Sequence, residues 1–316
     1  VSPTSLKRDV VDKWISAAVA AGYRETQDYN GVEQEGVGYF QLTISKGKRC
    51  SSAVAYLNPA RGRENLTIFT HTQVEKLLIE DGRVTGIIAK HKGQPVQLKA
   101  AREVILSAGA IGSPQILMLS GIGVSSELGA VGITTKKHLP GVGKNLQDHL
   151  QARPIFKTDL STINTETSNY FKQAIIGLQY VLRQTGPMTM AASLGAGFLK
   201  TDSRQETPDI QFHIQPFSAD NAIEGPHPFS AFTASVLQLR PESVGHLKLV
   251  SANIDDHPEI HPNYLAAEMD QRTIVKGIQI ARKIAQFEPL KSHITEEYQP
   301  GHAVAMDDYD ATLNWA

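Results

Sequence analysis

The sequence predicts a mixed fold, part α/β and part α+β. The first observation is in residues 65–123, where apolar runs separated by turn dipeptides lead into a strand, a small-residue turn and a helix. The second is in residues 209–251, where strand-like runs follow one another without intervening helices. Apolar helical patterns at 170–185 and 267–286 flank those runs. We therefore expect an antiparallel sheet flanked by helices in the second half of the chain.

The elements before residue 65 are short. Residues 9–22 have the periodicity of an amphipathic helix, and Gly22 is placed to terminate it. The glycine-rich segment 28–49 predicts a hairpin. Residues 50–65 predict a short helix that Pro59 interrupts.

A three-stranded meander, a fourth strand and a helix are expected between residues 65 and 123. The dipeptides Asp81-Gly82 and Lys92-Gly93 are turn signals between apolar-rich runs, so the strands should form a meander. The segment "EVILSAG", residues 103–109, predicts a short buried strand that ends in small residues. The following helix is expected to begin near Ser113, with Pro114 in its first turn.

The helix predicted at 170–185 is rich in apolar side chains. Its aromatic residues Tyr170, Phe171 and Tyr180 have near-helical spacing, and we interpret them as core residues rather than as a substrate cage.

Composition excludes several classes of protein. A hydrophobic content of 41% and a formal net charge of −1 fit a globular protein without the basic surface that nucleic acid binding requires. The single cysteine, Cys50, excludes an internal disulfide and fits a reducing compartment. The chain has no apolar run of about 18 residues, so no transmembrane segment is expected. We expect a cytoplasmic location, with membrane association left open.

Several catalytic signatures are absent from the sequence, namely CxxC, HExxH, GxSxG and GxGxxG. The segment "DDHPEIH", residues 255–261, holds five potential metal ligands. Its proline favours a structural turn, so no metal site is predicted.

The most informative stretch is "SAGAIGSPQILMLSGIG", Ser107–Gly123. Small residues at the end of a strand let a ligand or another segment approach the backbone closely. A helix that starts there presents free N–H groups, a combination that suits a nucleotide or a pyrophosphate. Tight packing of strand on helix, without a ligand, would explain the same residues.

Residues Gly109–Gly123 resemble the second signature of the glucose-methanol-choline (GMC) oxidoreductases, a family of FAD enzymes. The segment "LPGVGKNLQDH", Leu139–His149, resembles the stretch that follows that signature, and the likeness extends over residues 5–300. It implies that residues 1–149 form part of a Rossmann-like FAD-binding domain, with its main contact region at 65–123. Residues 150–316 would form a substrate-binding domain that is incomplete at its C-terminal end.

The resemblance also implies which residues contact FAD. The backbone of Val74 would lie on the adenine side, Ser107, Ala108 and Gly109 along the ADP part, and Asn145 and Asp148 near the flavin. Capping of a loop is the alternative role for Asn145 and Asp148.

Two family features are missing from this sequence. One is the amino-terminal GxGxxG fingerprint, and the other is the histidine motif that supplies the catalytic base, which is expected beyond Ala316. No catalytic residue is therefore assigned, and His149 and His213 are interpreted as structural. The chain is expected to be a central fragment that is inactive by itself and binds FAD weakly or not at all.

The implied reaction of the intact protein is FAD-dependent oxidation of an alcohol to an aldehyde or ketone, with hydride transfer to flavin N5. Choline-type members carry a carboxylate where "SLGAGF", Ser193–Phe198, has Leu194, so an uncharged alcohol is the expected substrate. The electron acceptor is a quinone or oxygen. A hydroxynitrile lyase of the same fold and a catalytically inactive fragment remain as alternatives.

Overall fold

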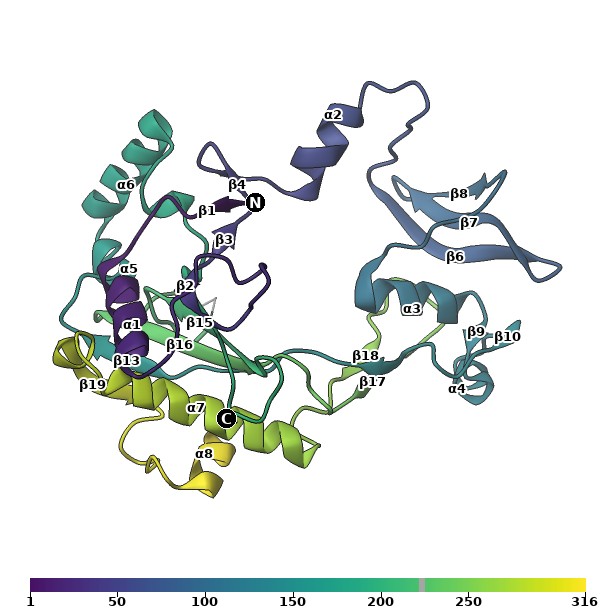
Figure 1. Ribbon diagram of the computed structural model, residues 1–316. Helices are drawn as coiled ribbons and strands as arrows, with labels where there is room; N and C mark the ends of the chain where they lie inside the picture. Colours follow the sequence, from purple (N-terminus) through teal and green to yellow (C-terminus); the bar gives the residue numbers. More distant parts are fainter. Residues whose placement is uncertain (222–224) are drawn as a thin grey trace. The chain divides into compact units, whose positions relative to one another are not determined.

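The computed structural model, which describes residues 1–221 and 225–316, consists of two compact units (Figure 1). The chain passes between these units after residues 58, 148, 241 and 266. Residues 1–58 therefore group with the later strands and not with residues 59–148, and the boundary near residue 150 stays a prediction about domains. We call residues 1–58, 149–241 and 267–316 the sheet unit, and residues 59–148 and 242–266 the meander unit.

A seven-stranded sheet is the framework of the sheet unit. Its strand order is β19-β13-β16-β15-β14-β2, with β12 also paired to β16, and all of its pairings are antiparallel. The predicted antiparallel sheet is therefore confirmed. Its strands are β2 (Gly36–Tyr39), β12 (Gln151–Ala152), β13 (Ile155–Thr158), β14 (Gly195–Leu199), β15 (Ile210–Gln215), β16 (Ala231–Gln238) and β19 (Ile294–Gln299).

Helices α1 (Asp9–Ala20) and α7 (Glu268–Ala285) pack on one face of this sheet. The sequence predicts a flanking role for α7 but not for α1. Small residues permit this close packing. A Cβ atom on Gly197 would lie 3.1 Å from the Trp14 ring, and one on Gly277 would lie 2.7 Å from Val236. Trp14 in turn packs at 5.8 Å, between ring centroids, from Phe212 of β15. The core of the sheet unit therefore lies between this face and the two helices.

The predicted helix at 170–185 is present as α6 (Tyr170–Arg183), but the prediction about its aromatic residues is wrong for two of them. Tyr170 is 89% exposed and Phe171 76% exposed, whereas Tyr180 is half-buried. The helix packs on the unit through the side that carries Tyr180 and Ile176. The near-helical spacing therefore predicted the helix correctly but not the side of it that faces inward.

Shorter elements complete the sheet unit and the segment that connects it to residue 59. The expected hairpin within 28–49 is β4 (Ile44–Ser45) with β5 (Lys48–Arg49), and the helix near Pro59 is a π-helical turn, η1 (Ala53–Leu57), continued by α2 (Asn58–Ala60). The others are β1 (Ser2–Pro3), β3 (Gln41–Leu42), α5 (Ile163–Glu166), η2 (Pro187–Thr189), η3 (Lys291–His293) and α8 (Tyr309–Trp315).

The meander unit contains the three expected strands, β6 (Thr72–Glu80), β7 (Arg83–His91) and β8 (Gln94–Lys99). Both predicted turns have two residues with positive φ, 50° and 75° at Asp81-Gly82 and 50° and 79° at Lys92-Gly93, the conformation that tight hairpins need. Helix α3 (Gly109–Leu119) packs on β6. The remaining elements are β9 (Ile122–Gly123), α4 (Ser125–Ala130), β10 (Lys137–His138), β11 (Lys144–Leu146), β17 (Gly245–Lys248) and β18 (Glu259–His261).

Two details before α3 differ from prediction. Residues 103–107 form no strand, and Ile105 is 80% exposed instead of buried. A buried strand needs partners on both edges, and no strand within the described residues pairs with this segment. Helix α3 also begins at Gly109, so Pro114 lies in its second turn.

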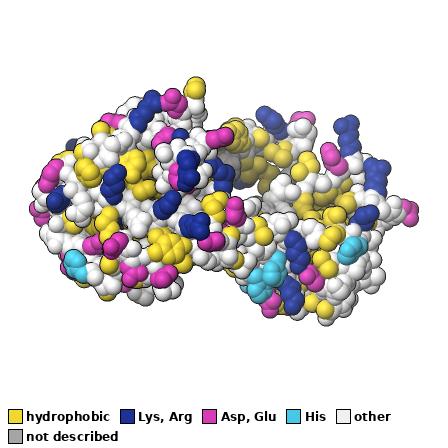
Figure 2. Space-filling view, turned by 60° about the horizontal axis from the view of Figure 1, so that its bottom comes forward, with side chains coloured by type: hydrophobic (Ala, Val, Ile, Leu, Met, Phe, Trp, Pro, Cys, Tyr) yellow, Lys and Arg dark blue, Asp and Glu magenta, His cyan; other side chains and the backbone are white. Residues whose placement is uncertain are grey.

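Among the residues that the structure describes, no helix combines the length and the apolar character needed to cross a bilayer. Figure 2 shows acidic and basic side chains interspersed on the face in view, which agrees with the net charge of −1.

Candidate functional site

The first candidate region is the start of helix α3 in the meander unit. Residues 107–110 are exposed, and Gly109 has a φ of +81°, a conformation that favours glycine. A Cβ atom at Gly109 would meet no heavy atom of the described residues within 4 Å. The backbone conformation thus favours glycine at this position, and the space around it is open to an approaching group.

The helix start has free donors. No side chain of the described residues caps α3 at Ala108, although the Ala108 N–H itself donates to Ser113 Oγ at 3.0 Å. The first turn contains no acidic residue. Unpaired N–H groups and the positive end of the helix dipole together favour a phosphate group. The residues at this helix start therefore fit the phosphate part of a dinucleotide.

The other predicted cofactor residues lie in the same unit. Val74 is half-buried in β6, at an irregularity of the ladder with β7. Asn145 is exposed in β11 with a φ of +57°, where the register with β17 shifts. Asp148 accepts a hydrogen bond from the Tyr264 hydroxyl, and this bond raises the pKa of Tyr264. Asp148 thus has a structural partner whether or not it contacts a cofactor.

The second candidate region is the face of the seven-stranded sheet opposite the helices. In β15 the side chains alternate strictly, with Ile210, Phe212 and Ile214 buried and Gln211, His213 and Gln215 half-buried. Since Phe212 packs on Trp14 of α1, the polar set points to the other face. The alternation is visible in "DIQFHIQ", so the sequence carried the signal for a polar sheet face, although it indicated no role for the glutamines.

Two buried polar atoms on this face have no partner among the described residues, the Gln215 Oε1 and the Ser235 Oγ. Ser235 is directly opposite His213 in the ladder between β15 and β16, so the two side chains share a face. Unpaired buried polar atoms are costly in a folded protein, and they mark places where a ligand or water completes the hydrogen bonding. Neither Gln215 nor Ser235 was identified from the sequence.

His213 is the titratable group at the centre of this face. Its Nδ1 lies 3.3 Å from Ser193 Oγ, and its ring centroid lies 5.0 Å from that of Phe40. Burial lowers the pKa of His213, and the neighbouring His149 lowers it further. The imidazole is therefore held neutral near pH 7, and one ring nitrogen can accept a hydrogen bond while the other donates one.

Leu194, the predicted substrate-pocket residue, lies in the sheet unit immediately before β14 and is fully buried. Its N–H donates to the Ile214 carbonyl at 3.0 Å, and its carbonyl accepts from the Phe40 N–H at 2.8 Å. Gly195 faces α1, so strand alternation places Leu194 on the polar face with His213. The structure thus places Leu194 in one unit and the six predicted cofactor residues in the other.

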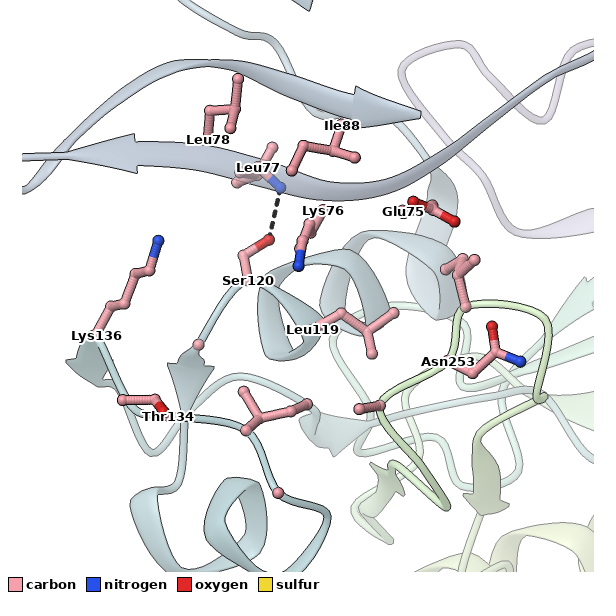
Figure 3. A pocket seen from close by; sticks show the side chains of 15 residues that line it. Glu75, Lys76, Leu77, Leu78, Ile88, Leu119, Ser120, Thr134, Lys136 and Asn253 are labelled. Carbon is pink, nitrogen blue, oxygen red and sulfur yellow. Dashed lines mark hydrogen bonds between the residues drawn. The ribbon is translucent and has the colours of Figure 1, made fainter. Parts of the chain in front are cut away.

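A cavity of ≈ 500 Å³ lies within the meander unit, between the end of α3 and the strands β6 and β7 (Figure 3). At its wall, Ser120 Oγ accepts the Leu77 N–H at 2.8 Å, which joins the helix to the meander. Residues 1–221 and 225–316 contain no cluster of three or more His, Cys, Asp or Glu side chains arranged to hold a metal ion.

Comparison with known proteins agrees with this geometry. Two GMC oxidoreductase family models match the chain, the N-terminal one over residues 4–151 and the C-terminal one over residues 241–314. Human mitochondrial choline dehydrogenase is 40% identical over 301 residues, covering 93% of this chain and 50% of that protein. An alcohol dehydrogenase (acceptor) of Pseudomonas putida is 36% identical over 298 residues, covering 93% of this chain and 54% of that protein.

Solved structures share the fold. A pyridoxine 4-oxidase from Mesorbium loti matches with a TM-score of 0.84 at 24% identity, covering 100% of this chain and 58% of that chain. An FAD-dependent oxidoreductase from Chaetomium thermophilum matches with a TM-score of 0.85 at 20% identity, covering 99% of this chain and 61% of that one.

The chain spans about half the length of the curated relatives that it matches. The two family models together cover most of its residues, and the N-terminal one includes Gly109–Gly123, the segment that resembles a GMC signature. The chain belongs to the GMC oxidoreductase family.

Proposed function

We propose that the whole protein binds FAD and oxidises an alcohol to an aldehyde or ketone. The observation that carries the proposal is the open, uncapped start of α3 at Gly109, in a chain of the GMC family. Ser107, Ala108 and Gly109 would lie along the ADP part of the cofactor. When bound, the flavin supplies the acceptor for a hydride from the alcohol carbon.

The chain's own contribution on the substrate side is orientation of the hydroxyl group. Gln215 and Ser235 offer buried polar atoms that lack partners among the described residues. Neutral His213 offers one donor and one acceptor beside them. We assign no general base within this chain.

The proposed substrate is an uncharged alcohol. A quaternary ammonium in a buried apolar site needs a counter-charge or an aromatic cage, and Leu194 provides neither. The relative named alcohol dehydrogenase (acceptor) supports this choice, and the relatives named choline dehydrogenase support the alternative, choline. A quinone or oxygen would accept the electrons. We propose a cytoplasmic location.

Paired substitutions at two glycines test cofactor binding. Gly109 and Gly93 have nearly the same φ, +81° and +79°, and a Cβ atom at either position would meet no heavy atom of the described residues within 4 Å. Asn tolerates this conformation and adds bulk. Gly109→Asn should lower the bound flavin per protein by about tenfold or more, since a close approach is blocked. Gly93→Asn should retain flavin. Equal flavin content in both variants of the whole protein would contradict the proposed site.

A further inference from the structure

Helix α6 of the sheet unit carries an apolar stripe that the described residues leave open. Six large side chains along 14 residues are exposed, from 51% at Ile175 to 89% at Tyr170. An exposed contiguous apolar surface in a folded protein generally marks an interaction site. The stripe consists of Tyr170, Phe171, Ile175, Leu178, Val181 and Leu182.

The stripe forms one side of an amphipathic helix. At 100° per residue the six side chains lie within about 140° of arc around the helix axis. Ile176 and Tyr180, which are half-buried, lie on another side and pack inward. Helix α6 thus exposes its apolar stripe to solvent and packs on the sheet unit through the side that carries Ile176 and Tyr180. Figure 1 shows α6 projecting beyond the strands of the sheet unit.

The charged side chains of α6 itself and of the neighbouring hairpin are positive, and Glu166, an acidic side chain beside Ile175, is paired with Arg8. The only charged residues of α6 are Lys172 and Arg183, both exposed. The hairpin β4–β5 lies against the C-terminal end of α6, because a Cβ atom on Gly47 would be only 2.3 Å from the Gln184 carbonyl oxygen. This hairpin adds the exposed cations Lys46, Lys48 and Arg49, and residues 43–50 contain no acidic side chain.

We propose that this surface, the α6 stripe with its basic neighbours, docks on an anionic lipid bilayer. An apolar helix face bordered by Lys and Arg is the pattern of helices that lie in the membrane interface. The cations would face lipid phosphates while the aromatic and aliphatic side chains enter the acyl boundary. The inference concerns a surface separate from the proposed reaction and stands independently of it.

Vesicle co-sedimentation of the whole protein tests the inference. The wild type should bind phosphatidylcholine vesicles containing phosphatidylglycerol better than pure phosphatidylcholine vesicles, and salt should weaken binding. The variant Phe171→Gln/Leu178→Gln/Leu182→Gln should bind on the order of a hundredfold more weakly. Lys46→Gln/Lys48→Gln should bind the anionic vesicles about thirtyfold more weakly.

The matched control removes three apolar side chains that are also exposed but lie elsewhere on the sheet unit, in Val19→Gln/Val32→Gln/Met306→Gln. This control should bind vesicles as the wild type does. Unchanged thermal unfolding of both triple variants would show that binding, and not folding, was altered.

Three results would overturn the inference. The first is a wild type that does not sediment with anionic vesicles. The second is equal binding by the two triple variants. The third is a wild-type dimer in analytical ultracentrifugation that the α6 variant alone dissociates, since this would assign the stripe to a second copy of the chain.

Discussion

Substitution of Ser120 by alanine should destabilise the meander unit. Ser120 is buried, and its Oγ accepts the Leu77 N–H at 2.8 Å (Figure 3). The same Oγ donates to the Ile116 carbonyl at 2.6 Å. The Ile116 carbonyl keeps a partner in the variant, because it also accepts the Ser120 N–H at 3.0 Å. The Leu77 N–H loses its acceptor in a buried place. The dominant cost is therefore that of one buried, unsatisfied amide.

Such an amide costs about 1–3 kcal/mol. With a typical urea dependence of about 1–3 kcal/mol per molar, the unfolding midpoint should fall by roughly 1 M. Trp14 and Trp315 both lie in the sheet unit, so tryptophan fluorescence would not report on the affected region. Circular dichroism of the unfolding and hydrogen exchange at the Leu77 amide are the appropriate measurements.

The matched control is Ser126→Ala, because Ser126 is exposed in helix α4 of the same unit. An exposed substitution of this kind should change stability by less than about 0.5 kcal/mol. If Ser120→Ala and Ser126→Ala have the same midpoint and the Leu77 amide remains protected, Ser120 does not join α3 to the meander as described.

Three further predictions concern the sheet unit. Gly195→Ala should cost about 1–3 kcal/mol of stability in chemical denaturation, since its Cβ would lie 2.8 Å from Ile214, whereas Gly177→Ala on α6 has free space and should be neutral or stabilising. Because the pKa of His213 is lowered in the folded chain, the unfolded chain binds more protons as pH falls below 6.5, and the free energy of unfolding should decrease there. The urea midpoint should therefore fall with pH, and it should fall less in the variant His213→Gln. Arg282→Ala should cost about 3–5 kcal/mol in thermal unfolding, because the buried guanidinium donates to a carboxylate and three carbonyl groups, and an unchanged melting temperature would refute this.

The sequence was sufficient for elements whose signals are local. The turns at Asp81-Gly82 and Lys92-Gly93 follow from residues that tolerate positive φ, and the helices α1 and α7 follow from their apolar periodicity. The small residues from Ser107 to Gly109 also predicted an exposed backbone that another group can approach closely. This could be predicted because the backbone conformation at Gly109, with its positive φ, depends on the local sequence.

Features that depend on distant partners could not be predicted. Residues 103–107 have the composition of a buried strand, yet strand formation depends on neighbours that local sequence does not specify. Tyr170 and Phe171 are apolar in a helical pattern, and periodicity alone does not say which side of a helix packs. The pairing of Ser235 with His213 required the register of β15 and β16, which is a tertiary property.

Anaerobic titration of the purified whole protein with alcohols, followed by flavin absorbance, tests the central claim most directly. The account predicts a bound flavin that bleaches with an uncharged primary alcohol, and faster than with choline. A flavin that no alcohol bleaches, together with cyanide release from a hydroxynitrile, would contradict alcohol oxidation and assign the protein to the lyase reaction. Faster bleaching with choline would contradict the role proposed for Leu194.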